Sequence, residues 1–504
     1  MMIPAAAAPS DGASATPAPP VAGRRPALVL VLVLVPVLLL GGCMAVGPDY
    51  RRPEAPVSAD WKQGALWKPA TPQDLSRGDA WWTAFSDSRL DALIAAIEPS
   101  NQNIRAAEAQ YRQALALITQ ARAGLFPTLT GNVQATRSQS PATTNARTGT
   151  TTTAGRATVQ DGGISASWEL DLWGRIARTL EANQASAQAS AADLAAARLS
   201  ARAALAQAYF QLRVAEQRAS LLADTVEANQ RALQIAQNRY AAGVVPRADV
   251  IQAQSQLASV QAQLIDTEVP RAQLQHAIAL LVGRPPAALS IPAGPLPPLP
   301  SQVPLALPST LLERRPDIAA AERRVAAANA QIGVAAAAWF PSLTLSGAAG
   351  FRSTDLSNWI TAPVRYWSLG PSLALTLFDA GRRRGIVDQN AAIYEQRVAQ
   401  YRQTVLAALV EVEDNLVALR VLSDEAAAQA RAVDLARQTL QITLNQYKAG
   451  LVGFNNVVTA QTSLLSAEQA ALSVLGRQFD ASVVLVRALG GGWSTTEPPV
   501  ASVP

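Results

Sequence analysis

Two side-chain types that often do chemistry occur only once each in this sequence, as Cys43 and His276. A thiolate or an imidazole can act as a nucleophile, a general base or a metal ligand, but each role needs a second group at a suitable spacing. A single cysteine excludes an internal disulfide and any cluster of cysteine ligands. His276 has no second histidine with which to share a metal ion, so the sequence predicts no metal site and no catalytic residue.

The sequence patterns of common enzymes are also absent. There is no Walker loop, no Gly-x-Ser-x-Gly elbow and no acidic cluster with metal-ligand spacing. The 42 Lys and Arg residues against 37 Asp and Glu give a net charge of +5, which is spread along the chain and forms no basic stripe. We therefore expect no enzymatic activity, no cofactor and no binding to nucleic acid.

Cys43 follows a segment with the features of a secretory signal. Arg24 and Arg25 precede the apolar run from Ala27 to Leu40, which at about 14 residues is short for a membrane-spanning helix. The stretch Leu40-Gly41-Gly42-Cys43 resembles the bacterial lipobox, in which cleavage leaves the cysteine as a new N-terminus that carries acyl chains. The alternative is an ordinary signal peptide followed by a free thiol.

The residue after Cys43 is Met44, and the absence of Asp at this position favours delivery of a bacterial lipoprotein to the outer membrane. We interpret residues 1–42 as a signal peptide with an N-terminal extension. Residues 43–88 are then the lipidated N-terminal segment.

The rest of the chain contains an internal repeat, which shows before any element is assigned. Tyr240–Leu257 recurs as Tyr447–Leu464 at a shift of 207 residues, with the Tyr, Gly, Val, Ala, Gln and Leu positions matched. Other pairs extend the repeat upstream: Gly174-Arg175 with Gly381-Arg382, and Phe126-Pro127 with Phe340-Pro341. A Thr-rich stretch at residues 141–159 is predicted to be a longer surface loop in the first copy.

The repeat divides the chain into similar halves. We place the first structural repeat at residues 89–283, a Pro-rich connector at 284–310, the second repeat at 311–489 and a C-terminal tail at 490–504. Each repeat is predicted to contain a helix, a strand pair, a very long helix, a tight turn and another helix.

The long helices are predicted from composition. The chain is 49% hydrophobic but only 5% aromatic, and residues 175–242 and 386–449 contain neither Gly nor Pro. Ala, Leu, Gln, Glu and Arg favour helices, and each stretch could extend roughly 100 Å. One apolar seam alternates spacings of four and three, as in a left-handed coiled coil: Val405, Leu409, Val412, Leu416 and Leu419.

The strand pairs alternate apolar and polar residues with period two, as strands between lipid and a wet interior do. For any single strand, a sheet packed on one face in a soluble protein is an equal alternative. Four strands cannot close a barrel, and an open sheet in lipid would leave backbone groups unpaired, so several chains must join. A barrel closed by two, three or four chains would satisfy this requirement. The apolar positions are Val133, Ala135, Ile164, Ala166, Trp168, Leu170, Leu172, Leu343, Leu345, Phe351, Trp367, Leu369, Leu373, Leu375 and Leu377.

From about Trp81 to Leu489 the chain resembles the TolC-like outer membrane factors, in particular their lipoprotein (NodT-like) branch in multidrug efflux. No single one of its motifs is specific for this family, but the motifs together are. The motifs are Trp81-Trp82-Thr-Ala-Phe85, Asp87-Ser-Arg-Leu90, Leu311-Leu-Glu-Arg-Arg-Pro-Asp-Ile318, Phe340-Pro341-Ser-Leu343, and Gly370-Pro371-Ser-Leu373 leading to Phe378-Asp379-Ala-Gly381-Arg382.

This resemblance implies a mostly helical homotrimer with a twelve-stranded barrel in the outer membrane and a helical barrel in the periplasm. It implies a passive exit duct for drugs and toxic compounds that docks onto a periplasmic adaptor and an inner-membrane pump of the RND type. The alternatives are a duct for type I protein secretion and a lipid-anchored periplasmic coiled-coil scaffold without a pore. The lipobox and the Leu-Glu-Arg-Arg-Pro-Asp stretch favour efflux.

The resemblance also places a gate and a docking surface at the two repeated turns. Asp249 and Tyr447 fall where related ducts pair an Asp with a Tyr to hold the aperture shut, and a phenol bonded to a carboxylate is a breakable latch. Leu451 could add a hydrophobic ring. The expected adaptor-contacting turns are Gly243, Val244, Val245 and Pro246 in the first repeat, and Gly450, Leu451, Val452 and Gly453 in the second.

The sequence departs from the family pattern at the aperture. Related ducts often carry acidic residues six and nine positions after the second turn glycine, where this chain has Asn456 and Thr459. With fewer carboxylates at the constriction, we expect weaker cation preference and weaker block by multivalent cations.

Overall fold

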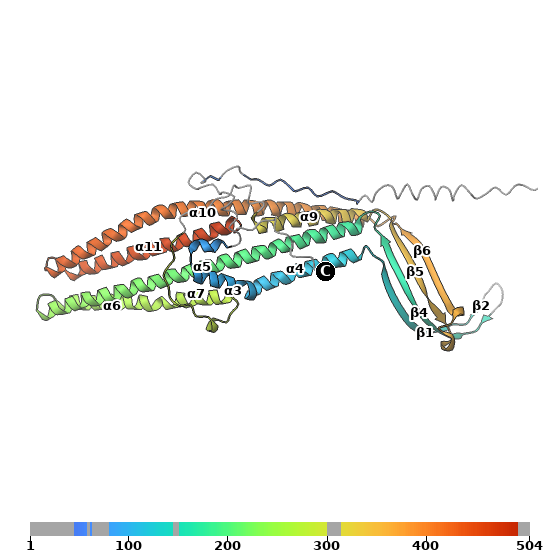
Figure 1. Cartoon of the computed structure of the whole chain (residues 1–504), viewed down its shortest axis with the longest axis horizontal. Helices are drawn as coiled ribbons and strands as arrows, with labels where there is room; N and C mark the ends of the chain where they lie inside the picture. The colour runs from blue at the N-terminus through green and yellow to red at the C-terminus, as the bar shows by residue number, and fades with distance from the viewer. Residues whose placement is uncertain (1–44, 58–60, 63–79, 145–150, 300–313, 492–504) are drawn as a thin grey trace, which may run out of the picture.

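A computed structural model describes residues 45–57, 61–62, 80–144, 151–299 and 314–491. The chain is elongated, with a twisted sheet at one end and two helical hairpin turns at the other (Figure 1). The predicted signal peptide and Cys43 lie outside the described residues, as does most of the C-terminal tail. No helix among the described residues has both the length and the apolar character needed to cross a membrane.

The first half begins with a short 3-10 turn and a helix, and then follows the predicted order. Its elements are η2 (Trp81–Phe85), α3 (Ser88–Ser100), α4 (Gln102–Ala123), β1 (Thr128–Ser140), β2 (Thr143–Thr144), β3 (Thr151–Thr152), β4 (Gly155–Leu170), α5 (Arg175–Ala241), α6 (Arg247–Asp266), α7 (Glu268–Leu281) and η3 (Pro286–Ala288).

The second half repeats the order of helix, strand pair, long helix, turn and helix. Its elements are α9 (Pro316–Ala337), β5 (Ser342–Ser353), η5 (Leu356–Asn358), η6 (Ala362–Val364), β6 (Arg365–Ala374), α10 (Arg382–Lys448) and α11 (Phe454–Ala488).

The long helices α5 and α10 contain 67 residues each. Both begin after a glycine in the left-handed region, Gly174 with φ 75° and Gly381 with φ 89°, where a side chain would be strained. The predicted coiled-coil seam lies on α10, where Val405, Val412 and Leu416 are buried against α9 and α11. This seam therefore holds the long helix of the second repeat to its neighbours.

The two repeats differ in their last helix. In the second repeat α11 is continuous, whereas the first repeat breaks at Thr267 into α6 and α7. Pro270 explains the break, because proline cannot donate a backbone hydrogen bond and is tolerated only in the first turn of a helix. The hydroxyl of Thr267 donates to the carbonyl of Leu264 at 2.6 Å and caps the end of α6.

The predicted Thr-rich loop at residues 141–159 is only partly correct. Strand β4 already begins at Gly155, and a short ladder of β2 and β3 extends the hairpin. The strand pairs are also shorter than predicted at their helical ends, since Leu172, Leu375 and Leu377 lie beyond β4 and β6. The backbone leaves the sheet at these points to enter α5 and α10.

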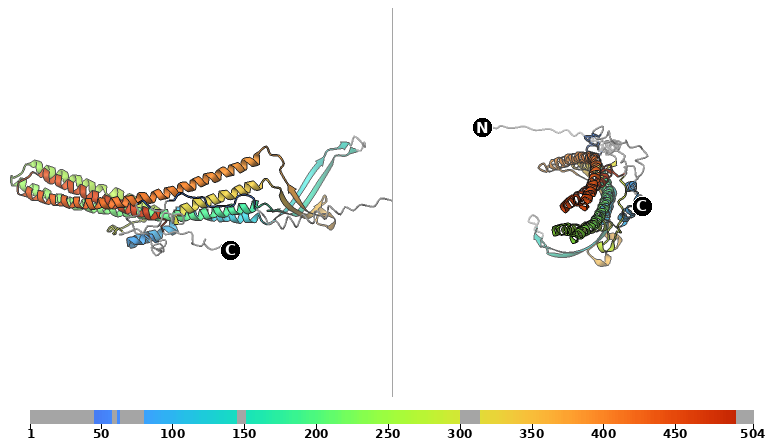
Figure 2. Two further views of the ribbon diagram at one scale, coloured as in Figure 1. Left: turned by 90° about the horizontal axis from the view of Figure 1, so that it is seen from above. Right: turned by 90° about the vertical axis from the view of Figure 1, so that its left-hand side faces the viewer.

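The sheet is antiparallel in the order β1-β4-β5-β6, so β1 and β6 each have one edge without a partner among the described residues. Figure 2 shows that it is curved. The register puts the predicted apolar residues of all four strands on one face, together with Leu129. Several large side chains of this face are exposed: Leu129, Val133, Ile164, Trp367, Leu369 and Leu373. Polar side chains occupy the opposite face.

Candidate functional site

The two repeated turns lie at the end of the molecule farthest from the sheet (Figure 1). Gly243 has φ 72° and Gly450 has φ 80°, and neither could carry a side chain without strain. The next amide in each turn donates to a carbonyl of the preceding long helix: Val244 to Arg239 and Leu451 to Gln446, both at 2.9 Å. Each hairpin therefore closes with the same local geometry.

Tyr447 and Asp249, which are 198 residues apart in sequence, meet at this tip. The phenol of Tyr447 donates to Oδ2 of Asp249 at 3.4 Å, joining α10 to α6. The ring of Tyr447 is only 2% exposed and packs edge-on against Phe454 with a centroid distance of 5.3 Å. Burial, followed by the nearby charge of Asp249, raises the pKa of Tyr447, so its hydroxyl remains a donor at neutral pH.

Arg239 is part of the same cluster, although no pattern in the sequence predicted a role for it. Its guanidinium lies 5.0 Å from the centre of the Tyr447 ring, and Nη1 donates to the carbonyl of Lys448 at 2.6 Å. Arg239 thus fixes the end of α5 to the end of α10. The equivalent residue in the second repeat, just before Tyr447, is Gln446, so Arg239 is a position at which the two repeats differ.

The other predicted tip residues surround this cluster. Leu451, Asn456 and Thr459 are exposed, and Thr459 donates to the carbonyl of Asn455 at 3.0 Å within α11. The side chain of Gln252 donates to that of Asn455 at 2.8 Å and links α6 to α11. In the turns, Gly243, Val244, Pro246, Gly450 and Gly453 are exposed, while Val245 and Val452 are half-buried against the tip cluster.

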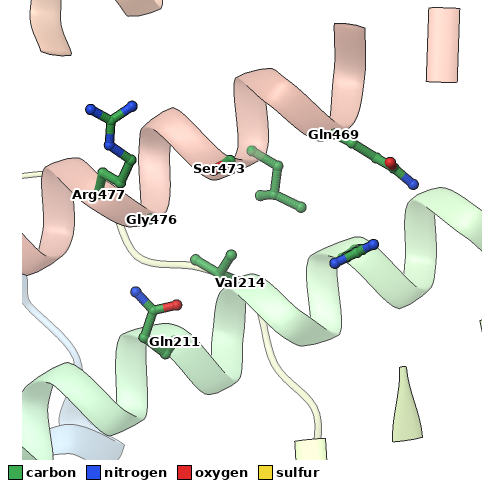
Figure 3. A pocket seen from close by; sticks show the side chains of 8 residues that line it. Gln211, Val214, Gln469, Ser473, Gly476 and Arg477 are labelled. Atoms are coloured by element: carbon green, nitrogen blue, oxygen red, sulfur yellow. The ribbon is translucent and has the colours of Figure 1, made fainter. Parts of the chain in front are cut away.

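A groove of about 300 Å³ separates α5 from α11 closer to the middle of the molecule (Figure 3). Gln211 and Val214 face Ser473, Gly476 and Arg477 across it. The amide of Gln211 also donates to Oδ2 of Asp480. The carboxylate of Asp480 is thus held between the two hairpins.

Asp480 provides a pH-dependent test of this contact. Burial raises the pKa of Asp480 above its ordinary value of 3.8, and the bond from Gln211 only partly offsets this. A carboxyl group with a raised pKa in the folded state costs stability where it is ionised, and the cost fades as the pH falls toward 3.8. We expect Asp480→Asn to raise the melting temperature at pH 7, with a gain that shrinks toward pH 4.

The matched control is Asp434→Asn, which removes the same charge from an exposed position on α10. An equal gain in both variants, or a gain in Asp480→Asn that does not change with pH, would contradict the burial argument.

A cluster of charged and aromatic side chains lies on the polar face of the sheet. Asp161 accepts hydrogen bonds from Nη2 of Arg352 at 2.5 Å and from the phenol of Tyr366 at 3.1 Å. Tyr366 reaches Asp161 across Gly163 and Gly350, where added side chains would meet its hydroxyl at about 3 Å. The polar face thus carries a paired charge, as expected of a surface in contact with water.

The segment after Cys43 lies along the outside of the helices. The amide of Val46 donates to the carbonyl of Trp173 at 3.0 Å, and Nη2 of Arg178 bonds to Asp49 at 2.9 Å. The side chain of Asn329 donates to the carbonyl of Pro48 at 2.9 Å. Residues 45–57 are thus held against α5 and α9, beginning where the sheet meets the helices.

These features define a class of protein, an outer-membrane channel subunit. Its sheet has one lipid-compatible face, and its helical hairpins extend away from the sheet. The chain belongs to the outer membrane efflux protein family, whose model matches residues 93–284 and 307–491.

Individual relatives and a solved structure support this family assignment. The toluene efflux pump outer membrane protein TtgF of Pseudomonas putida is 34% identical, over 90% of this chain and 95% of that protein. The probable outer membrane lipoprotein SilC of Salmonella typhimurium is 29% identical, over 92% of this chain and 98% of that protein. The structure of the outer-membrane channel OprN superimposes with a TM-score of 0.82 at 32% identity, covering 89% of this chain and 99% of that one.

The family, the mostly helical fold with a four-stranded antiparallel sheet per chain, the function as an efflux channel and the outer-membrane location are therefore confirmed. The domain boundaries and the roles of the tip residues remain predictions.

Proposed function

We propose that this chain forms a homotrimer whose twelve strands close a barrel in the outer membrane and whose helices form a periplasmic duct. The observation that supports this most directly is the four-stranded sheet with an exposed apolar face and two edges, on β1 and β6, that no described segment of the chain pairs with. In lipid, each unpaired backbone group costs several kcal/mol, so the edges must be paired by other copies. Three copies give an even strand number within the range of bacterial barrels.

Acylation of Cys43 anchors each copy to the membrane. Ala45, two residues later, lies against Gly174 at the boundary between sheet and helix, where a Cβ on Gly174 would be 2.7 Å from it. Ala45 is thus close to the end of the apolar sheet face. The anchor and the barrel engage the same membrane.

The tip turns bind a periplasmic adaptor, which couples the duct to an RND-type inner-membrane pump. The duct carries out no reaction itself, so the pump supplies the energy and selects the compounds. The exposed turn residues Val244, Pro246 and Leu451 support this assignment, because they form the end of the molecule remote from the membrane.

The bond between Tyr447 and Asp249 closes the aperture, and Arg239 positions the Tyr447 ring. The aperture opens when the hairpin of α10 and α11 moves away from that of α5 and α6. A single, long hydrogen bond suits a gate that a docked partner must open. The exposed Asn456 and Thr459 leave the aperture with little negative charge.

Reconstitution tests the proposal as a whole. We expect the purified mature lipoprotein to have the mass of three chains and to give discrete conductance steps in planar bilayers, with only weak preference for cations. Chemical crosslinking in cells should then co-purify it with an adaptor and a pump. A monomeric protein without conductance would refute the trimeric duct, and strong cation selectivity would refute the role given to Asn456 and Thr459.

A further inference from the structure

The apolar face of the sheet carries charge at only one end. Within β1, β4, β5 and β6, the charged residues on this face are three arginines: Arg137, Arg156 and Arg365. The register places Arg137 on the same face as Leu129 and Val133, and Arg365 on the same face as Trp367 and Leu369. The acidic residues of these strands, Asp161 and Glu169, lie on the opposite face.

Arg137 and Arg365 lie at the outer boundary of the apolar band of the barrel. Arg137 is about nine residues from the helical end of β1 at Thr128, and Arg365 is about nine residues from the helical end of β6 at Ala374. Nine residues of a strand tilted by about 40° rise roughly 23 Å, close to the apolar band of about 25 Å in outer-membrane barrels. Both arginines therefore lie at the outer surface of the membrane.

Arg156 extends the cationic surface outward. It pairs with Gln139, to which its Nε donates at 3.2 Å, and Arg137 pairs with Thr158, so the two arginines are diagonal neighbours on adjacent strands. Such neighbours are about 7–8 Å apart. Two cations at this distance on a surface beside lipid repel each other unless an anion lies between them.

The loop between β5 and β6 adds aromatic and apolar groups to the same surface. The Trp359 ring packs on Gly162, where an added Cβ would be 2.7 Å away, and its Nε1 donates to the carbonyl of Phe351 at 3.2 Å. Leu356 and Ile360 of this loop are exposed. Tryptophan is typical of the membrane interface, so this loop rests at the level of the lipid headgroups.

We infer that Arg137, Arg156 and Arg365 form a belt that binds the phosphorylated headgroups of the anionic glycolipid in the outer leaflet. Guanidinium groups bind phosphate through two parallel hydrogen bonds, and the apolar surface below them accommodates the acyl chains of the same lipid. The inference rests on the proposed trimer, because edge-to-edge joining of β6 and β1 brings Arg365 and Arg137, which lie at equal depth, to a common seam between copies.

Lipid binding by the purified trimer tests this belt. The test variant is Arg137→Gln/Arg156→Gln/Arg365→Gln, and the matched control is Arg384→Gln/Arg420→Gln/Arg431→Gln, which removes equal charge from exposed positions on α10. Diphosphorylated lipid A and chemically dephosphorylated lipid A are titrated into each protein in mixed micelles. We expect the belt variant to bind the phosphorylated lipid about tenfold or more weakly than wild type and the control variant to match wild type.

The dephosphorylated lipid should bind wild type and belt variant equally. Equal binding of diphosphorylated lipid A to wild type and belt variant would overturn the inference, as would displacement of the lipid by a few millimolar inorganic phosphate (about the affinity of a simple anion site). Trimer mass and bilayer conductance are measured on the same samples. A wild-type protein without the trimer mass or the conductance would refute the proposed duct. A belt variant that keeps both and binds diphosphorylated lipid A as wild type does would refute the belt alone.

Discussion

Tyr447→Phe is expected to raise the resting conductance of the reconstituted channel, with the open fraction increasing by about tenfold or more. The variant keeps the buried ring on Phe454 and beneath Arg239, and it removes only the hydroxyl that bonds to Asp249. One such bond contributes about 0.5–1.5 kcal/mol, and a trimer loses three of them, which shifts the equilibrium by about 1.5–4.5 kcal/mol. Single-channel recording measures the change directly.

The internal repeat supplies the control for this experiment. Tyr240 is the counterpart of Tyr447 in the first repeat, but it is 47% exposed, and the position equivalent to Asp249 is Asn456. Tyr240→Phe should therefore leave the conductance unchanged. If the two variants behave alike, the bond between Tyr447 and Asp249 does not hold the aperture shut.

Arg213→Ala is expected to destabilise the protein by about 3–5 kcal/mol, because it leaves a buried carboxylate without its main partner. The side chain of Arg213 is 1% exposed, and its Nη1 bonds to Glu216 at 2.5 Å and to the carbonyl of Pro292 at 3.0 Å. Its Nη2 donates to the phenol of Tyr209 at 3.2 Å, and that phenol donates to Asp87 at 2.6 Å. Chemical or thermal unfolding of the trimer measures the loss.

The cluster around Arg213 also fixes the start of the Pro-rich connector. The amide of Gly294 donates to Glu216 at 3.3 Å, so two points of this segment are bound to α5 by charged groups. Burial, followed by the bond to Asp87, raises the pKa of Tyr209 to about 12, so the phenol remains a donor throughout the neutral range. The network loses several bonds at once when Arg213 is removed.

Arg231→Ala is the appropriate comparison for Arg213→Ala. Arg231 also lies on α5 and pairs with Glu227 at 2.6 Å, but both side chains are about two-thirds exposed. An exposed pair one helical turn apart contributes about 0.3–0.5 kcal/mol, so this variant should unfold almost as wild type does. A loss below about 1 kcal/mol for Arg213→Ala would show that water replaces the guanidinium and that the buried network is not required.

The sequence by itself determined the features that depend on local composition and on periodicity. Ala-rich stretches free of Gly and Pro specify α5 and α10, and period-two alternation specifies the faces of the strands. The repeat that matches Tyr240 with Tyr447 fixed the order of elements, and the glycines at 243 and 450 fixed the turns. With one His and one Cys, the sequence predicted no catalytic or metal site.

Only the tertiary structure decided which distant groups meet. Pairing of β4 with β5 brings Asp161 to Arg352, and packing of the two hairpins brings Arg239 onto Tyr447. Likewise, no spacing in the sequence predicts that Arg213 is buried beside Pro292 or that Asp480 is held against Gln211. Helix and strand propensities act over a few residues, whereas burial and charge pairing depend on contacts between segments that the chain brings together only when it folds.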